Sequence, residues 1–257
     1  MGDQESGEQQ SGLFPDLPIR AKRCDPLAVS ADCKQVCRCD DGSDYAIKEA
    51  AVIASMPHNE WLCAKLAERV SIAAAPFRIV DVLGIQCFGS RWLAGEESDW
   101  WNKAFAGQFP FTDIAPGITR IFTLDLFVHN HDRHLNNYFV VKQKVGHAVL
   151  AMDFGRAWLF SGFPPPALPM EKTSNTIGDY RKLVTLFGDF LDHSEVDDVC
   201  DKILGVTVDE ISGFIASHPR DWLEQSMKDA ICDWWSSDDK SLRVEGIREG
   251  IKNGSLL

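Results

Sequence analysis

The stretch His131-Asp132-Arg133-His134-Leu135-Asn136-Asn137, followed by Asp153-Phe154-Gly155, is the part of the sequence that decides the expected fold. Asp132 and Asn137 stand five positions apart, and Asn137 and Asp153 stand sixteen apart. The first interval is the one between the catalytic aspartate and the metal-binding asparagine of protein-kinase loops. The order and the spacing together therefore predict a phosphotransferase site.

The residues between Asn137 and Asp153 have the pattern of a β-hairpin. Tyr138 to Val141 and Ala148 to Met152 are the expected strands, and Gly146 lies in the turn between them. A hairpin brings its two ends side by side, so we expect Asn137 and Asp153 to face one metal ion.

Two residues further upstream complete the pattern. Lys48 ends a short expected strand, and Glu60 lies in a helix expected over residues 59–70. A strand lysine can bind the phosphates of ATP if a helix glutamate aims it by ion pairing. Glu49 and Glu68 are the alternatives for that glutamate. Glu49 follows Lys48 directly and would point to the opposite face of the strand, and Glu68 lies two turns further along the helix.

Phosphoryl transfer depends on holding the phosphates in place and on offsetting their charge with cations. Mg²⁺ prefers oxygen ligands from one or two side chains together with phosphate oxygens, and Asn137 and Asp153 are suitable. Asp132 is then left to accept a proton from the attacking hydroxyl, or to orient that hydroxyl. Each of these residues alone is also typical of a turn or a loop cap. Their occurrence together, in this order after Lys48, favours the functional interpretation.

The segment Phe127 to Asn137 resembles the catalytic segment of HipA-like kinases, and its Asp-Arg-His element is also similar to phosphoinositide kinases. Further local similarities to a compact HipA-like family extend from about residue 27 to about residue 222. They are Tyr45-Ala46-Ile47-Lys48, Asn59-Glu60, Phe88-Gly89-Ser90-Arg91, Asp153-Phe154-Gly155-Arg156-Ala157 and His218-Pro219-Arg220-Asp221-Trp222.

The resemblance implies an α+β, two-lobed, protein-kinase-like fold that uses ATP and Mg²⁺. We expect a disordered tail over residues 1–12, a strand-rich, nucleotide-binding N-lobe over 13–93 and a helical, catalytic C-lobe over 94–257. Carried over to this sequence, Lys48 holds phosphates, Asp132 is the catalytic aspartate, and Asn137 and Asp153 bind Mg²⁺. The wider group includes toxins that phosphorylate aminoacyl-tRNA synthetases, but nothing in this sequence indicates that target.

The sequence departs from the protein-kinase pattern ahead of Lys48, where no Gly-x-Gly-x-x-Gly occurs. The stretch Val29 to Gln35 stands at the position of a phosphate-covering loop, and its backbone N–H groups could still bind phosphate, with Ser30 as a candidate contact. The departure leaves open a reduced ATP affinity or a loop that orders on binding. The adenine-binding hinge is expected near residues 88–93, with Phe88 and Arg91 among the nucleotide-binding positions.

Charge and cysteine content limit the partners and the compartment. A net charge of −12 excludes nucleic-acid binding by general phosphate neutralisation and disfavours anionic membranes. No signal peptide or membrane-spanning apolar run is visible, so we expect a cytoplasmic protein with reduced thiols. Cys33, Cys37 and Cys39, with Cys24 upstream, are alternative zinc ligands, although they lack a clean Cys-x-x-Cys pair.

The leading functional hypothesis is a Mg-ATP-dependent kinase that acts on serine or threonine of a protein substrate. Two alternatives stay open. The Asp-Arg-His element favours a lipid or small-molecule kinase, and the unusual phosphate loop favours a nucleotide-binding pseudokinase that serves as an interaction module.

Overall fold

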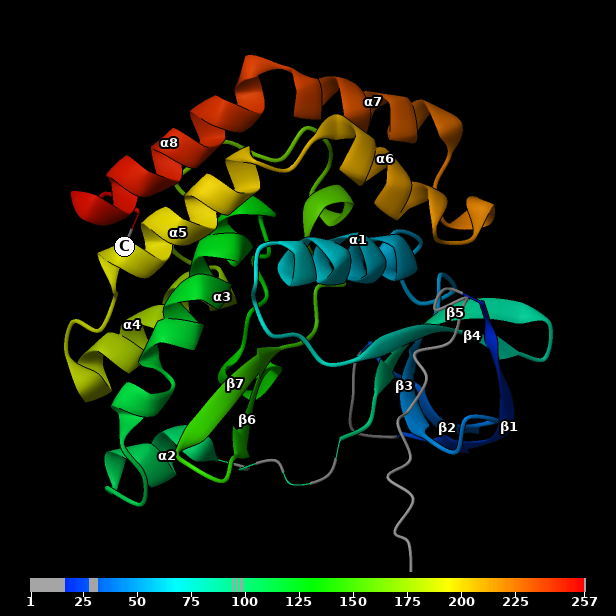
Figure 1. The fold of residues 1–257 in the computed structure, drawn as a ribbon, viewed down its shortest axis with the longest axis horizontal. Coiled ribbons are helices and arrows are strands. Elements are labelled where there is room, and N and C mark those ends of the chain that lie inside the picture. Colours follow the sequence, from blue (N-terminus) through cyan, green and yellow to red (C-terminus); the bar gives the residue numbers. More distant parts are fainter. Residues whose placement is uncertain (1–16, 28–31, 94, 96, 98, 257) are drawn as a thin grey trace, which may run out of the picture.

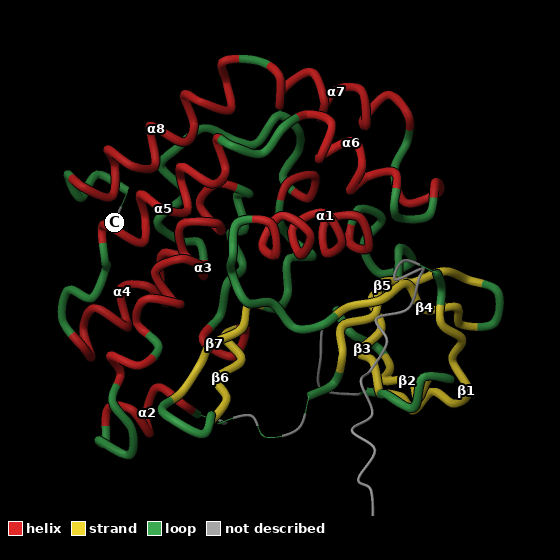
Figure 2. The backbone as a smooth tube through the Cα atoms, viewed as in Figure 1, coloured by secondary structure: helices red, strands yellow, loops and turns green. Residues whose placement is uncertain are grey.

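The computed structural model describes residues 17–27, 32–93, 95, 97 and 99–256 of the 257-residue chain. It is an α+β fold with a strand-rich N-lobe and a helical C-lobe, which confirms the predicted class (Figures 1 and 2). The predicted tail over residues 1–12 and the predicted phosphate contact Ser30 lie outside the described residues. The predicted boundary between residues 93 and 94 falls between the last N-lobe strand and the first C-lobe helix, and it stays a prediction.

The N-lobe is built on a five-stranded closed barrel with the strand order β1-β2-β3-β5-β4. The strands are β1 (Ile19–Pro26), β2 (Gln35–Cys39), β3 (Asp44–Lys48), β4 (Phe77–Val82) and β5 (Ile85–Arg91). Side chains alternate across β3, because successive residues of a strand point to opposite faces. Tyr45 and Ile47 enter the apolar cluster inside the barrel, and Ala46 and Lys48 face the opposite side.

Helix α1 (Met56–Arg69) follows β3 and lies between the barrel and the helices of the C-lobe (Figure 1). It starts three residues earlier than the sequence pattern predicts, because Pro57 suits a first helical turn. Nearly every residue of its first three turns is buried. A helix with so little exposed surface is held by tertiary packing on several sides.

The C-lobe begins with α2 (Trp100–Phe105) and α3 (Ala115–Phe127). The predicted hairpin follows as β6 (Tyr138–Lys142) and β7 (His147–Ala151), paired antiparallel. Five further helices complete the lobe: α4 (Asn175–Phe187), α5 (His193–Leu204), α6 (Val208–Ala216), α7 (Gln225–Ser236) and α8 (Asp238–Lys252). One large apolar core joins α1 to these elements. No helix of the described part is long and apolar enough to cross a membrane.

The C-terminal helices α6 and α7 begin in different ways. A capping box starts α6, in which Thr207 and Glu210 satisfy each other's backbone N–H groups. The N-cap residue of α7, Glu224, makes no side-chain capping hydrogen bond. Residues 220–222 form a 3-10 turn, Leu223 is extended, and α7 begins only at Gln225. Trp222 turns away there and packs against Trp61 of α1.

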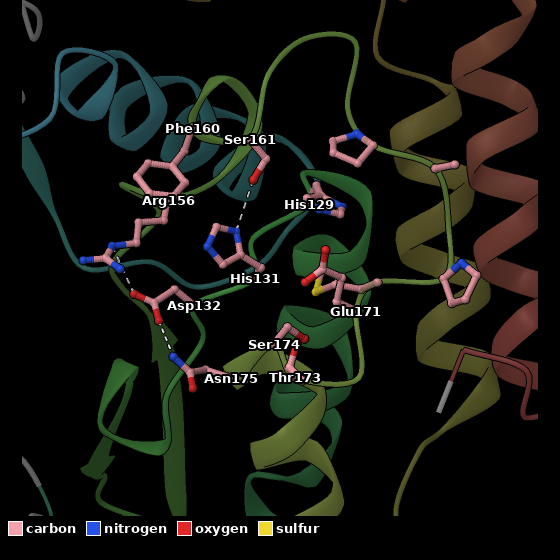
Figure 3. Close-up of a pocket in the computed structure, with 14 residues that line it drawn as sticks. His129, His131, Asp132, Arg156, Phe160, Ser161, Glu171, Thr173, Ser174 and Asn175 are labelled. Carbon is pink, nitrogen blue, oxygen red and sulfur yellow. Dashed lines mark hydrogen bonds and ion pairs between the residues drawn. The ribbon is translucent and has the colours of Figure 1, made fainter.

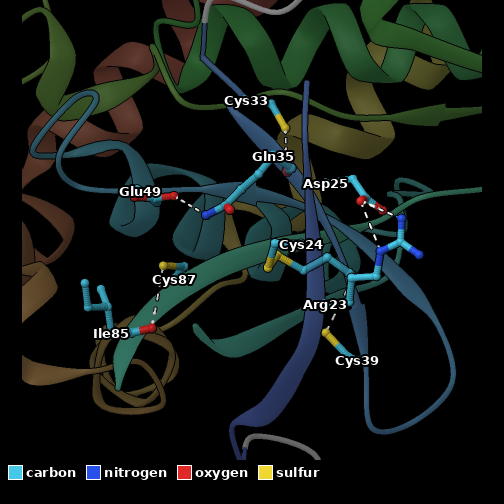
Figure 4. Close-up of a disulfide and its surroundings, with 10 residues drawn as sticks. Arg23, Cys24, Asp25, Cys33, Gln35, Cys39, Glu49, Ile85 and Cys87 are labelled. Atoms are coloured by element: carbon cyan, nitrogen blue, oxygen red, sulfur yellow. Dashed lines mark hydrogen bonds and ion pairs between the residues drawn. A yellow bond between two sulfur atoms is a disulfide. The ribbon is translucent and has the colours of Figure 1, made fainter. Parts of the chain in front are cut away.

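The prediction of reduced thiols is wrong for two cysteines of the barrel. Cys24 of β1 and Cys37 of β2 are disulfide-bonded (Figure 4). They are direct partners in the β1–β2 ladder, which explains why the two sulfur atoms meet. A disulfide sulfur is not a thiolate ligand, and the described residues contain no group of three or more metal-binding side chains. The zinc alternative therefore finds no support among the described residues. The cytoplasmic location stays a prediction.

Candidate active site

Lys48, Glu60 and Asp153 come together in a buried ion cluster between the two lobes. The Lys48 ammonium contacts Glu60 Oε1, and its Nζ atom lies 2.6 Å from Asp153 Oδ1. The sequence thus identified the correct glutamate. Glu49 instead accepts a hydrogen bond from Gln35 (2.7 Å), and Glu68 is exposed at the far end of α1.

The charges of this cluster depend on each other. Burial alone would lower the pKa of Lys48, but the carboxylates of Asp153 and Glu60 outweigh it and raise that pKa. The pKa of Glu60 is raised, mainly because the side chain is fully buried. Burial also acts to raise the pKa of Asp153, but Lys48 and Arg133 lower it overall. Lys48 is therefore cationic and Asp153 anionic at neutral pH.

Local contacts around Gly155 hold Asp153 against α1. Asn59 donates hydrogen bonds to the carbonyls of Gly155 (3.0 Å) and Ala157 (2.7 Å). A Cβ atom on Gly155 would lie 3.1 Å from Met56 and 3.3 Å from Glu60. The glycine thus permits the close approach that lets Glu60 reach Lys48, and the Asn59-Glu60 pair of the sequence has a physical role.

The loop before Asn137 is anchored by a fully buried ion pair. Arg133 Nε lies 2.7 Å from Asp125 Oδ2, and Arg133 Nη2 lies 2.8 Å from Asp125 Oδ1. Arg133 also donates to the carbonyls of Asn137 (3.1 Å) and Met152, at the two ends of the β6–β7 hairpin. The arginine of the Asp-Arg-His element therefore shapes the loop, and it is not available to bind a phosphate.

Asp132 lies at the surface end of the same loop, and both of its carboxylate oxygens have partners. Oδ1 accepts a hydrogen bond from the Asn175 amide and lies 3.1 Å from His134 Nε2. Oδ2 lies 3.3 Å from Arg156 Nε. These groups use part of the hydrogen-bonding capacity of the carboxylate, so a further donor competes with them for Asp132.

Asn137 and Asp153 fit the oxygen chemistry that Mg²⁺ requires. The ends of β6 and β7 meet as predicted, with Tyr138 opposite Ala151. The Asn137 amide nitrogen donates to the Asp132 carbonyl (3.4 Å), which leaves the amide oxygen for a cation. Asp153 has a backbone φ of 65°, in the left-handed region that few residues other than glycine occupy, although aspartate enters it more often than most. Such strain at a charged side chain is typical of functional sites.

A cavity of about 400 Å³ lies between the lobes beside the ion cluster. Lys48, Asn137, Asp153 and Arg91 belong to its wall. Its apolar wall comes from both lobes and has the character of a site for a flat ring: Leu27, Ala46, Ala75, Leu93, Phe139 and Met152. Four of the predicted nucleotide and metal residues thus line one space.

Phe88 is a different case from the other predicted nucleotide-binding residues. Its side chain is buried in an aromatic cluster with Trp61 and Trp222, and it stacks on Phe77. It is not among the described residues that line the 400 Å³ cavity. On β5, the wall of that cavity begins at Ser90, so the segment Ser90 to Leu93 takes the place expected of the hinge.

A second cavity, of about 580 Å³, opens on the other side of Asp132 (Figure 3). The loop that contains Asp132 contributes His129, His131 and Asp132, and the segment after Asp-Phe-Gly contributes Arg156, Phe160 and Glu171. His129 is 7% exposed, and its Nδ1 atom has no hydrogen-bond partner within the described part of the chain. Burial lowers the pKa of His129 to about 4, so the ring is neutral near pH 7. Asp132 thus lines a cavity that is large enough for a small molecule or a side chain.

Four residues that shape the candidate site were not predicted from the sequence: Asp32, Asp125, Arg156 and Asn175. Arg156 occurred in a quoted motif, but its position three residues after Asp153 gave no indication of a role. Asn175 reaches Asp132 from the start of α4, 43 positions away in the chain. Asp32 meets Arg156 across 124 positions. Only the tertiary structure brings such distant residues together.

Comparison with known proteins agrees with this geometry. Residues 32–91 match the model of a family described as HipA-like kinase. The resemblance to HipA-like kinases is confirmed. The matched residues include Lys48, Glu60 and the β5 strand, which form the N-lobe part of the candidate site. This match supports a function of the kinase type.

Two solved structures are similar to this chain in fold. The Helicobacter pylori proinflammatory kinase CtkA is similar over 91% of this chain and 98% of its own, with a TM-score of 0.61 and 10% identity. HipA of Shewanella oneidensis MR-1, solved with HipB and operator DNA, covers 80% of this chain and 57% of its own length, with a TM-score of 0.47 and 12% identity. The first confirms the two-lobed kinase-like fold. No curated protein sequence matches the chain.

Proposed function

We propose that this protein is a Mg-ATP-dependent phosphotransferase that phosphorylates serine or threonine of a protein. One observation carries the proposal. Lys48, held by Glu60, lines one cavity together with Asp153 and Asn137. Asp132, five residues before Asn137 in the same loop, lines a second cavity. A nucleotide and an acceptor would then bind on opposite sides of the loop.

The nucleotide side of the proposal follows from the charges. The apolar wall accepts adenine, and Lys48, held by Glu60, bonds to the α- and β-phosphates. Asn137 and Asp153 would hold Mg²⁺, which offsets phosphate charge when it is bound. Because Glu60 is buried and close to Lys48, the ammonium is aimed without help from a glycine-rich loop.

The acceptor side depends on Asp132. The acceptor hydroxyl enters the 580 Å³ cavity, and Asp132 accepts its proton as the oxygen attacks the terminal phosphorus. The HipA-like family match supports a protein acceptor. The net charge of −12 makes an anionic lipid surface an unfavourable partner.

The test is phosphate transfer from γ-labelled ATP with Mg²⁺, alone and with a cell lysate, for wild type and Asp132→Asn. We expect labelled protein with wild type and none with the variant, although both bind ATP. A matched control is Asp192→Asn, at the exposed N-cap of α5. This variant should transfer as much labelled phosphate to protein as wild type does. Mg-dependent ATP binding without labelled protein would favour a small-molecule or lipid kinase, or a pseudokinase. Absence of ATP binding would overturn the proposal.

A further inference from the structure

Arg156 forms an ionic bridge between the two lobes at the site of the proposed chemistry. Its Nε and Nη2 atoms lie 3.1 Å and 3.2 Å from the two carboxylate oxygens of Asp32, just before β2 in the N-lobe. The same Nε lies 3.3 Å from Asp132 Oδ2 in the C-lobe, and the guanidinium carbon lies 5.5 Å from the Phe160 ring centre. Figure 3 shows Arg156 beside Phe160 at one edge of the pocket, with a dashed line joining it to Asp132.

Three cations surround the acidic residues of the site, and they differ in what holds them. Lys48 is buried between Glu60 and Asp153, and Arg133 is buried against Asp125. The Arg156 side chain is 31% exposed, and its ion pair with Asp132 is longer than the other two pairs. A longer and partly exposed ion pair contributes less to stability than a buried one and is more readily exchanged. Arg156 is therefore the cation that can change partners when a more highly charged group arrives.

We propose that Arg156 is a further catalytic residue, which leaves Asp132 and bonds to the terminal phosphate of the bound nucleotide. This inference rests on the proposed phosphotransferase function. Asp32 keeps the guanidinium directed at the site from the N-lobe side. A planar guanidinium suits this role because it binds two phosphate oxygens at once.

The movement of Arg156 from Asp132 to the phosphate links nucleotide binding to the release of Asp132, the proposed general base. Once Arg156 has moved to the phosphate, Asp132 Oδ2 is open to the acceptor hydroxyl. In the transfer, the acceptor oxygen bonds to the γ-phosphorus, and the bond from that phosphorus to the β–γ bridging oxygen breaks. The acceptor's proton passes to Asp132, and the bridging oxygen leaves with ADP. Arg156 balances the charge on the moving phosphoryl group.

The experiment compares Mg-AMP-PNP with Mg-ADP by isothermal titration calorimetry, because only the first carries a terminal γ-phosphate. We expect Arg156→Ala to weaken Mg-AMP-PNP binding by about tenfold or more, with Mg-ADP binding changed by less than about twofold. Arg156→Lys should retain part of the preference for Mg-AMP-PNP over Mg-ADP, because lysine keeps the positive charge but cannot form the two-pronged contact of a guanidinium. The control is Arg181→Ala, an exposed arginine of α4, with no effect on either ligand.

Rescue of turnover by added guanidinium gives a second readout, which a purely structural role of Arg156 would not produce. Arg156→Ala should lower kcat by a factor of about 10³ or more, with partial recovery in added guanidinium. Equal weakening of both nucleotides, or no weakening of either, overturns the role of Arg156. If Arg156→Ala does not fold, the ratio of the two nucleotide affinities measured with Arg156→Lys tests the role of Arg156. Wild type that binds both nucleotides but transfers no phosphate overturns the proposed function, and the affinity ratio still tests Arg156. Wild type that binds neither nucleotide overturns both.

Discussion

Lys48 is a buried cation that depends on two carboxylates, Glu60 and Asp153. Its side chain is 8% exposed, and that of Glu60 is 3% exposed. Isolated buried charges are strongly unfavourable, whereas a paired and hydrogen-bonded group is tolerated. The cluster therefore links stability to function, because the residues proposed to bind phosphate and metal also neutralise one another.

Removing the lysine should leave two carboxylates without their cation. We expect Lys48→Met to lower the free energy of unfolding by about 3–5 kcal/mol. The double variant Lys48→Met/Glu60→Gln should recover part of this loss, because the glutamine carries no charge. Urea unfolding of the single and double variants measures this coupling, which we expect to be about 1–3 kcal/mol. Additive losses would contradict a coupled cluster.

Asp153 should decide the metal dependence of nucleotide binding. With Asp153→Ala, we expect the stimulation of ATP binding by Mg²⁺ to disappear, because one of the two proposed oxygen ligands is lost. Calorimetry of ATP binding in the presence of Mg²⁺ and in the presence of EDTA measures this stimulation. The control is Asp192→Ala, at the exposed N-cap of α5. Full Mg²⁺ stimulation in Asp153→Ala would assign the metal to other residues.

At the scale of elements, α1 is tied to the segment after α6 by two histidines. His58 Nδ1 lies 2.9 Å from His218 Nε2, and His218 Nδ1 lies 2.7 Å from the Pro219 carbonyl. His218 must donate to that carbonyl, so His58 donates to His218. The Nε2 atom of His58 is buried and has no partner in the described part of the chain. Both rings are neutral in this arrangement, and burial lowers the pKa of His58 to about 3.

This histidine pair should make the fold sensitive to acid. Between pH 6.5 and 3 the unfolded chain binds a proton at residue 58 that the folded protein does not. Stability therefore falls as the pH falls, by about 1.4 kcal/mol per pH unit for this one histidine. Urea unfolding at pH 5, 6 and 7 should show a flatter dependence for His58→Gln than for wild type. The control is His193→Gln, on the exposed start of α5, and a slope unchanged by His58→Gln would contradict the prediction.

At the scale of the whole molecule, the two lobes share an aromatic interface. Trp61 of α1 donates to the Phe214 carbonyl (3.1 Å), and Trp222 donates to the Gln86 carbonyl of β5 (3.1 Å). Trp61, Phe88 and Trp222 belong to one buried cluster. Interfaces that resemble a core couple the unfolding of the parts that they join.

The lobes should therefore unfold in a single transition. We expect thermal unfolding to coincide when followed by tryptophan fluorescence and by far-UV circular dichroism. Trp222→Ala should lower the free energy of unfolding by about 3–5 kcal/mol, because it leaves a cavity between the lobes. The exposed Trp92 provides the control, since Trp92→Ala should cost far less. Two separate transitions in wild type would show that the lobes unfold independently.

Much of the candidate site could be predicted from the sequence, because pairs of its residues stand only a few positions apart on neighbouring elements. Asn137 and Asp153 are joined by a hairpin, and strand pairing alone brings its ends together. Lys48 and Glu60 are 12 positions apart, on a strand and the next helix. Phe88 lies opposite Lys48 on the cavity side of the sheet. Trp61, Phe77 and Trp222 cover its side chain there, and the sequence around Phe88 gives no sign of this tertiary packing.

The sequence by itself determined the chemistry of this protein: which residues carry charge, their order, and the short segments that position them. The tertiary structure alone decided which distant residues meet. The Cys24–Cys37 disulfide needed the register of β1 on β2. The His58–His218 pair spans 160 positions, and the Arg156–Asp32 pair spans 124. Such contacts depend on how the two lobes pack, and that packing results from many apolar side chains acting together, with no local signal at either partner.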